Sequence, residues 1–82
     1  MISVIGVRPR DDGSACRALV SVRLDCGVVI NGVRIIERAD GSLFAQLPNQ
    51  RDSSGAWFPV IEVPEDVSAR VKDAALEAYW RV

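Results

Sequence analysis

The sequence lacks histidine, has two cysteines and contains no long apolar run, and each shortage excludes a class of protein. Without histidine, no side chain ordinarily titrates near neutral pH, which removes Ser–His and Cys–His nucleophiles and most zinc sites. No apolar stretch approaches the roughly 20 residues of a membrane-spanning helix. We therefore expect neither an enzyme nor a membrane protein, and we expect no metal, cofactor or small-molecule substrate.

The two cysteines are too far apart in the expected fold to form a disulfide. Cys16 and Cys26 flank one predicted strand, which separates them by about 33 Å if it is straight. A disulfide requires Cα atoms about 6 Å apart. Two unpaired thiols favour a reducing, cytoplasmic location.

Length and charge allow one ordinary globular domain over residues 1–82. Apolar residues make up 49% of the chain and charged residues 26%, and the formal net charge is −1. A core of this size is marginal, so a second subunit would help to stabilise it. All basic residues except Lys72 are arginine. Arginine suits phosphate recognition, but the base composition of a genome can produce the same bias.

Alternation of apolar and polar residues predicts an antiparallel sheet in the first three quarters of the chain. Strands are expected over residues 2–8, 17–25, 28–37, 43–47 and 57–63, and residues 48–55 read as a polar loop. The pair Asn31-Gly32 allows either a hairpin turn or a bulge inside one long strand. We favour the bulge, because Asp25-Cys26-Gly27 already closes a hairpin with matched arms.

From Pro64 onward the apolar period becomes that of a helix. Pro64 suits the first turn, and Glu65 and Asp66 suit the positive helix N-terminus. The buried stripe is predicted to consist of Val67, Val71, Ala74, Ala75 and Ala78. Leu76 and Trp80 are expected roughly opposite this stripe, which makes them candidates for a subunit interface; alternatively, Trp80 folds back on its own chain. The predicted fold is α+β, a small mostly antiparallel sheet of about five strands followed by one C-terminal helix.

Five sequence blocks occur in a fixed order along the chain. They are VIGVRPR at 4–10, RALVSVRLD at 17–25, VRIIE at 33–37, GSLFAQLP at 41–48 and VKDAALEAY at 71–79. Together they resemble the stage V sporulation protein G family, the bacterial septation regulators. The resemblance implies a cytoplasmic homodimer paired through strands, which regulates septation, sporulation and gene expression, binds DNA or RNA and has no catalytic activity.

Two departures from the family pattern lower the positive charge. After Pro48 the family has serine and then a basic residue, where this chain has Asn49 and Gln50. The family segment F-R-D-I-x-H-P is replaced by WFPVIEVP at 57–64. These changes support an alternative function, a protein–protein interaction module that keeps the fold and has lost the nucleic-acid surface.

The candidate nucleic-acid contacts are basic residues that match family motifs or lie in the polar loop: Arg8, Arg10, Arg51, Arg70 and Lys72. Each has a structural alternative. Arg8 and Arg10 would also protect an edge strand from aggregation, Arg51 would be a solvated loop charge, and Arg70 and Lys72 would belong to a solvated helix face. Among the aromatic residues, Phe44 is expected in the core. Trp57 borders the polar loop, where an exposed ring would allow base stacking.

Overall fold

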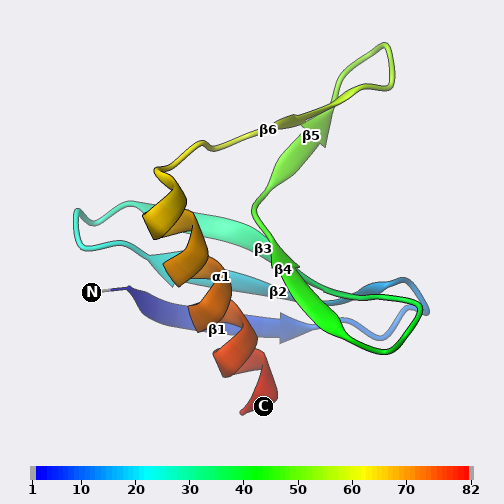
Figure 1. The fold of residues 1–82 in the computed structure, drawn as a ribbon, viewed down its shortest axis with the longest axis horizontal. Helices are drawn as coiled ribbons and strands as arrows, with labels where there is room; N and C mark the ends of the chain where they lie inside the picture. Colours follow the sequence, from blue (N-terminus) through cyan, green and yellow to red (C-terminus); the bar gives the residue numbers. More distant parts are fainter. Residues whose placement is uncertain (1, 82) are drawn as a thin grey trace.

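Four strands form one antiparallel sheet in chain order (Figure 1). The computed structural model describes residues 2–81. The strands are β1 (Ser3–Pro9), β2 (Cys16–Arg23), β3 (Val29–Glu37) and β4 (Leu43–Gln46). A separate hairpin of β5 (Asn49–Arg51) and β6 (Trp57–Pro59) follows, and α1 (Glu65–Trp80) comes last. The predicted α+β fold, antiparallel strands followed by a C-terminal helix, is confirmed.

The polar stretch expected as a loop contains a strand, and the strand predicted after it is shorter than expected. The carboxylate of Asp52 accepts backbone N–H groups from Ser54 and Ala56, both at 2.9 Å, which closes a tight turn. This turn pairs Asn49–Arg51 with Trp57–Pro59. The expected strand over 57–63 therefore ends at Pro59, beyond which the chain runs on to α1 without a partner strand.

The Asn31-Gly32 pair is a bulge inside β3, as predicted. Val20 pairs with Val33 and Val22 pairs with Ile30, so the register shifts across these two residues. Gly32 has φ of +83°, a left-handed conformation that glycine adopts without steric cost. β3 thus continues through the irregularity as one strand.

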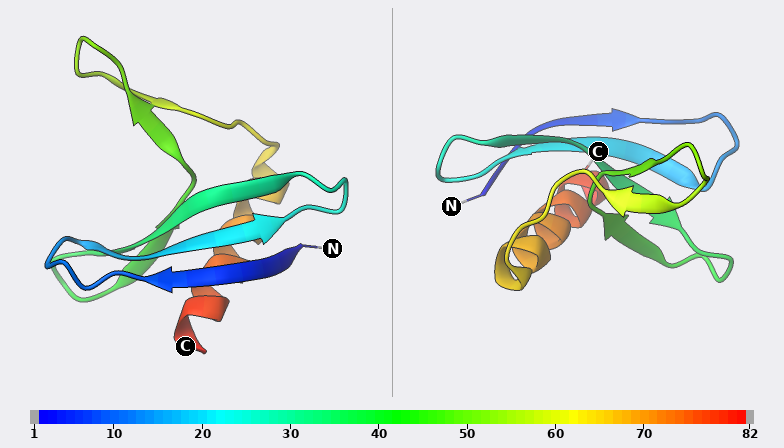
Figure 2. Two further views of the ribbon diagram at one scale, coloured as in Figure 1. Left: turned by 180° about the vertical axis from the view of Figure 1, so that it is seen from behind. Right: turned by 90° about the horizontal axis from the view of Figure 1, so that it is seen from above.

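The helix covers one face of the sheet and leaves the other open (Figures 1 and 2). It packs on all four sheet strands. The buried core consists of Ala18, Val20, Val22, Ile30, Val33, Ile35, Ala45, Val71 and Ala75. Alternation along each strand directs the sheet residues of this core to the helix side, where they meet Val71 and Ala75 of α1. The other side is called the open face below.

The apolar stripe of α1 is wider than predicted. Val71 and Ala75 are fully buried, whereas Val67, Ala74 and Ala78 are partly exposed. Leu76, expected roughly opposite the stripe, is half-buried and packs against the core. It follows Ala75 by only 100° around the helix, and a helix that crosses four strands buries a broad arc.

The cysteine prediction is confirmed: Cys16 and Cys26 are both free. Across residues 2–81, no helix is long and apolar enough to span a membrane.

Candidate nucleic-acid interface

Strand register places a polar row across the open face. Arg8 pairs with Leu19, Leu19 with Arg34, and Arg34 with Gln46. Directly paired residues in antiparallel strands share a face. Their chain neighbours Val20, Val33, Ile35 and Ala45 are buried beneath the helix. The row therefore lies on the open face and spans all four strands. Figure 2 (left) views the sheet from this face, with α1 behind it.

Charge is separated between the strands and the helix. The six strands carry Arg8, Arg17, Arg23, Arg34 and Arg51, against one carboxylate, Glu37. Glu37 is paired with Arg17, whose Nε lies 2.8 Å from its Oε1. The helix carries four carboxylates and two cations. A net charge of −1 thus conceals a basic sheet and an acidic helix.

The β5–β6 hairpin places an exposed tryptophan between two arginines. The Trp57 ring centroid lies 5.9 Å from Cζ of Arg34 and 5.5 Å from Cζ of Arg51. Arg34 Nη2 donates a hydrogen bond to Asn49 Oδ1 at 3.1 Å, and Arg51 Nε donates to the Gly55 carbonyl at 3.3 Å. Trp57 is 57% exposed, which leaves its ring accessible. Arg34 joins this hairpin cluster to the row on the open face.

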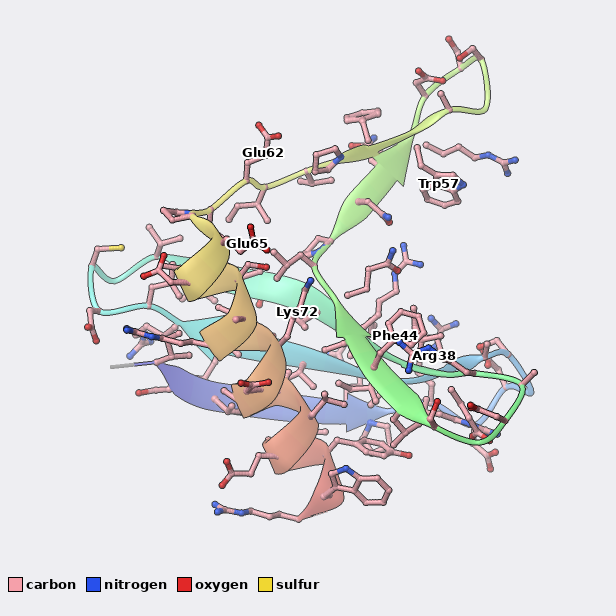
Figure 3. The ribbon with its side chains drawn as sticks, in the orientation of Figure 1. Arg38, Phe44, Trp57, Glu62, Glu65 and Lys72 are labelled. Carbon is pink, nitrogen blue, oxygen red and sulfur yellow. The ribbon has the colours of Figure 1, made fainter. Side chains whose placement is uncertain are left out.

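A second arginine–aromatic pair lies beside β4. Arg38 Cζ is 4.3 Å from the Phe44 ring centroid, and its Nη1 donates to Ser42 Oγ at 3.3 Å (Figure 3). Phe44 pairs with Ile36 and is half-buried. The expectation that Phe44 lies in the core is wrong, because Ala45 takes the inward position and strand alternation turns Phe44 to the open face.

Of the predicted nucleic-acid contacts, Arg8 lies in the row on the open face and Arg51 lies in the hairpin cluster. Arg10, in contrast, is engaged in an ion pair. Arg10 Nη2 forms an ion pair with Asp12 Oδ2 in the β1–β2 turn. Hydrogen bonds from Ser14, and then from Arg10, hold the pKa of Asp12 well below its usual range. Arg10 is therefore already partnered within its own turn.

The two helix cations lie on opposite flanks of α1. Arg70 lines a groove of about 530 Å³ together with Leu24, Asp73 and Glu77. Lys72 extends toward the segment that joins β4 to β5 (Figure 3) and lines a hollow of about 290 Å³ shared with Trp57. Of this pair, Lys72 adjoins the hairpin cluster, and Arg70 lies in an acidic neighbourhood away from it.

Sequence reasoning missed Arg34 and Arg38 as site residues. Arg34 stands between the buried residues Val33 and Ile35. In a strand, neighbouring residues point to opposite faces, so an arginine between two buried apolar residues must lie on the exposed face. The position of Arg34 in the sequence therefore already indicated a charged open face. The stacking of Arg38 on Phe44 depends on the β3–β4 turn, which the local sequence does not specify.

Three turns share an Asp-x-Ser pattern that has a structural role. Hydrogen bonds from Ser14, Ser42 and Ser54 lower the pKa of Asp12, Asp40 and Asp52, each two residues earlier in the chain. Such bonds to a backbone turn are typical of Asx turns. In residues 2–81, no group of three or more potential ligands is placed to hold a metal ion.

The predicted interface residues have different surroundings. Leu76 is committed largely to the core of its own chain. Trp80 is 71% exposed at the end of α1, and its ring packs edge-on against Tyr79 with centroids 6.0 Å apart. Trp80 therefore does not fold back into its own core.

The fold and surface together define a helix-backed antiparallel sheet whose open face is basic and partly aromatic. The family model SpoVG matches residues 1–81, and the chain belongs to this family. SpoVG proteins are septation proteins that are not known as enzymes.

Individual relatives agree with this assignment. A protein of Desulforudis audaxviator (strain MP104C), which carries the name septation protein SpoVG, is 32% identical over 79 residues, covering 95% of this chain and 89% of the relative. Proteins of the same name from Staphylococcus aureus (strain JH9) and Staphylococcus haemolyticus (strain JCSC1435) are each 33% identical over 64 residues. These matches cover 77% of this chain and 63% of each staphylococcal relative.

Proposed function

We propose that this SpoVG-family protein binds nucleic acid, as a regulator of septation and gene expression, through the open face and the β5–β6 hairpin. The observation that carries the proposal is Trp57, exposed between Arg34 and Arg51 at the end of an arginine-bearing sheet. Arginine contacts phosphate through its planar fork, and an exposed ring offers a stacking surface for a base. The contacts belong mainly to the phosphate backbone, because few polar groups on this face suit a base edge.

Binding should be weak and sensitive to salt. Three arginines, Arg8, Arg34 and Arg51, define the surface, and three phosphate contacts on a single strand give a slope of log K against log salt of about −2. We expect a Kd of about 10⁻⁴ to 10⁻⁶ M, the range typical of non-specific binding at physiological salt.

The test is a fluorescence-anisotropy titration at low salt with mixed-sequence DNA and RNA, single-stranded and duplex. The double variant Arg34→Ala/Arg51→Ala should lose most of the binding. Arg81→Ala is the matched control, because Arg81 lies at the helix end in a pair with Glu77. No binding by the parent protein at tens of micromolar, or an equal loss in the control, would rule out this surface.

Dimerisation is a second part of the proposal. An indole that is 71% exposed on a small domain is a typical interface residue. We expect Trp80, more than Leu76, to lie in a homodimer contact. Sedimentation velocity at high micromolar concentration should show a dimer that Trp80→Ser weakens, and a stable monomer would refute this part.

The protein–protein module is the rival function, and the groove of about 530 Å³ between α1 and the β2–β3 turn is the observation that favours it. Ile2, Leu24 and Val67 give this groove an apolar lining, with Asp73 and Glu77 at its side. If the parent protein binds no oligonucleotide, this groove becomes the leading candidate surface.

A further inference from the structure

A shallow trough of about 500 Å³ lies between β1, β2 and β3, and it involves open-face positions that the hairpin cluster does not include. Gly6, Ser21 and Gly32 form its small-residue part, and Arg8, Leu19 and Asn31 supply its larger side chains. We call this feature the glycine trough. Its volume falls within the range of sites that hold small organic ligands, so a single nucleotide unit would fit.

Gly6 lies at a register irregularity of β1, between Val4 and Gly6, but neither its φ nor its packing requires glycine. Its φ is not among the positive values found at five other glycines. A Cβ built on Gly6 meets no atom within 4 Å, so packing does not exclude a side chain either. Glycine inside a strand weakens it, and often marks a bulge, as the register shift of β1 does here, or a place where a ligand or another backbone approaches closely. The open space above Gly6 is therefore a feature that a bound group would use.

The polar groups of the trough suit an anionic ligand with hydrogen-bond acceptors. Ser21 Oγ donates to Asn31 Oδ1 at 2.8 Å, which leaves the side-chain amide N–H groups of Asn31 available. Arg8 adds a cation, and within residues 2–81 it forms no salt bridge. None of the seven lining residues, which include Val7, carries a carboxylate.

The same face favours a single strand over a duplex. Stacking on Trp57 requires a base whose face is free, whereas bases in a duplex already stack on one another. The helix is the element that usually enters a major groove, but here it carries four carboxylates and its apolar side is buried in the core. A sheet face that combines arginine with an exposed ring is typical of single-strand binding.

We propose that the glycine trough holds one nucleotide of a single-stranded nucleic acid, another base of which stacks on Trp57, with Arg34 contacting the backbone between them. This inference rests on the proposed function and specifies its substrate class and path. The row Arg8–Leu19–Arg34 connects the two subsites across β1, β2 and β3.

Two substitutions test the trough. Gly6→Val fills the open space with a side chain that favours strands, and Asn31→Asp keeps the shape and the acceptor for Ser21 but adds negative charge. Ser3→Val is the matched control, because it adds the same side chain to β1 at a residue that does not line the trough. Thermal melts should show Gly6→Val folded, with a Tm at or above that of the parent. If that variant does not fold, Asn31→Asp alone decides the test.

Binding is measured by anisotropy with labelled DNA and RNA oligonucleotides of about 12 nucleotides, within the site size of small single-strand-binding folds, each as a single strand and as a duplex. We expect the single strands to bind about tenfold more tightly than the duplexes, and each trough variant to lose about tenfold in affinity. Ser3→Val should match the parent.

The possible failures are distinct. Binding of the duplex at least as tightly as the single strand overturns this inference and leaves the proposed function standing. Folded trough variants that bind as tightly as the parent protein would likewise overturn this inference and leave the proposed function standing. No binding of any oligonucleotide by the parent protein overturns both.

Discussion

Replacing Arg34 by lysine would separate the charge of this residue from its geometry. Arg34 is half-buried, donates to Asn49 at 3.1 Å and lies 5.9 Å from the Trp57 ring. Lysine keeps the positive charge but lacks the planar fork that makes both contacts at once. We expect Arg34→Lys to bind nucleic acid less tightly than the parent while keeping the same dependence on salt.

The magnitude follows from the second hydrogen bond that the guanidinium fork donates to a phosphate and that a lysine ammonium does not replace. A hydrogen bond from a charged donor contributes about 1.5–3 kcal/mol. Because Arg34 is partly solvated, we expect a net loss of about 1–2 kcal/mol in binding free energy. This corresponds to about a 5- to 30-fold higher Kd.

Arg34→Ala completes the comparison. It removes the charge as well, so the slope of log K against log salt should become shallower by about 0.7 for a single strand. The assay is anisotropy at several salt concentrations between about 100 and 200 mM, where the helix carboxylates are screened from the open face. Arg81→Lys and Arg81→Ala, at the helix end, provide the matched controls. Parental affinity in Arg34→Lys would show that the planar fork of Arg34 plays no part in binding, and an unchanged slope in Arg34→Ala would show that Arg34 contacts no phosphate.

Three further predictions concern the core, a turn and the exposed ring. Ile35 is fully buried at the centre of the sheet, so Ile35→Ala should lower the free energy of unfolding by about 2–5 kcal/mol in urea titrations; a loss below about 1 kcal/mol would contradict the assigned core. Hydrogen bonds from Ser54 and Ala56 lower the pKa of Asp52, so its carboxylate stabilises the hairpin turn above the unfolded pKa of about 3.9, and this stabilisation is lost as the pH falls through the lower folded value. In the parent protein, the amide NMR shifts of the hairpin should therefore change as the pH falls through this range. Asp52→Asn should abolish that change, and a change that persists in the variant would point to another titrating group. Trp57→Ala should raise the Kd about 5- to 150-fold with little change in Tm, because the ring is largely exposed, whereas Trp57→Phe should retain most of the affinity; equal binding by both variants and the parent would exclude stacking.

The spacing of apolar residues along the chain and the residues typical of turns made most of the fold predictable. Alternation located β2 and β3, and the change of period located α1. The bulge at Asn31-Gly32 was predictable because a nearby turn already accounted for the hairpin. β5 was not, since Asn49–Arg51 has no apolar alternation. It becomes a strand through the side chain of Asp52, whose hydrogen bonds fix the turn to β6.

The candidate site was less predictable, because it depends on register. Single basic residues could be read from the sequence, but not which of them share a face. Arg8 and Arg34 are 26 positions apart and meet only through their common partner Leu19. Arg10 has the same charge as Arg8 and lies two residues later, yet the Asp12 turn neutralises it. Pairing between strands therefore decides which arginines form a surface.

Charge separation also changes what the net charge of −1 implies about binding. The molecule measures 19 Å along its shortest axis, the direction in which α1 is stacked on the sheet (Figure 1). At physiological ionic strength the Debye length is about 8 Å, so the helix carboxylates are screened from a ligand on the open face. At about 0.01 M salt it is about 30 Å, longer than this axis, and the carboxylates then oppose the arginines. As the salt concentration is lowered, the affinity for nucleic acid should therefore rise until about 0.1 M and then level off. The affinity of a protein that is basic on all sides would continue to rise below about 0.1 M.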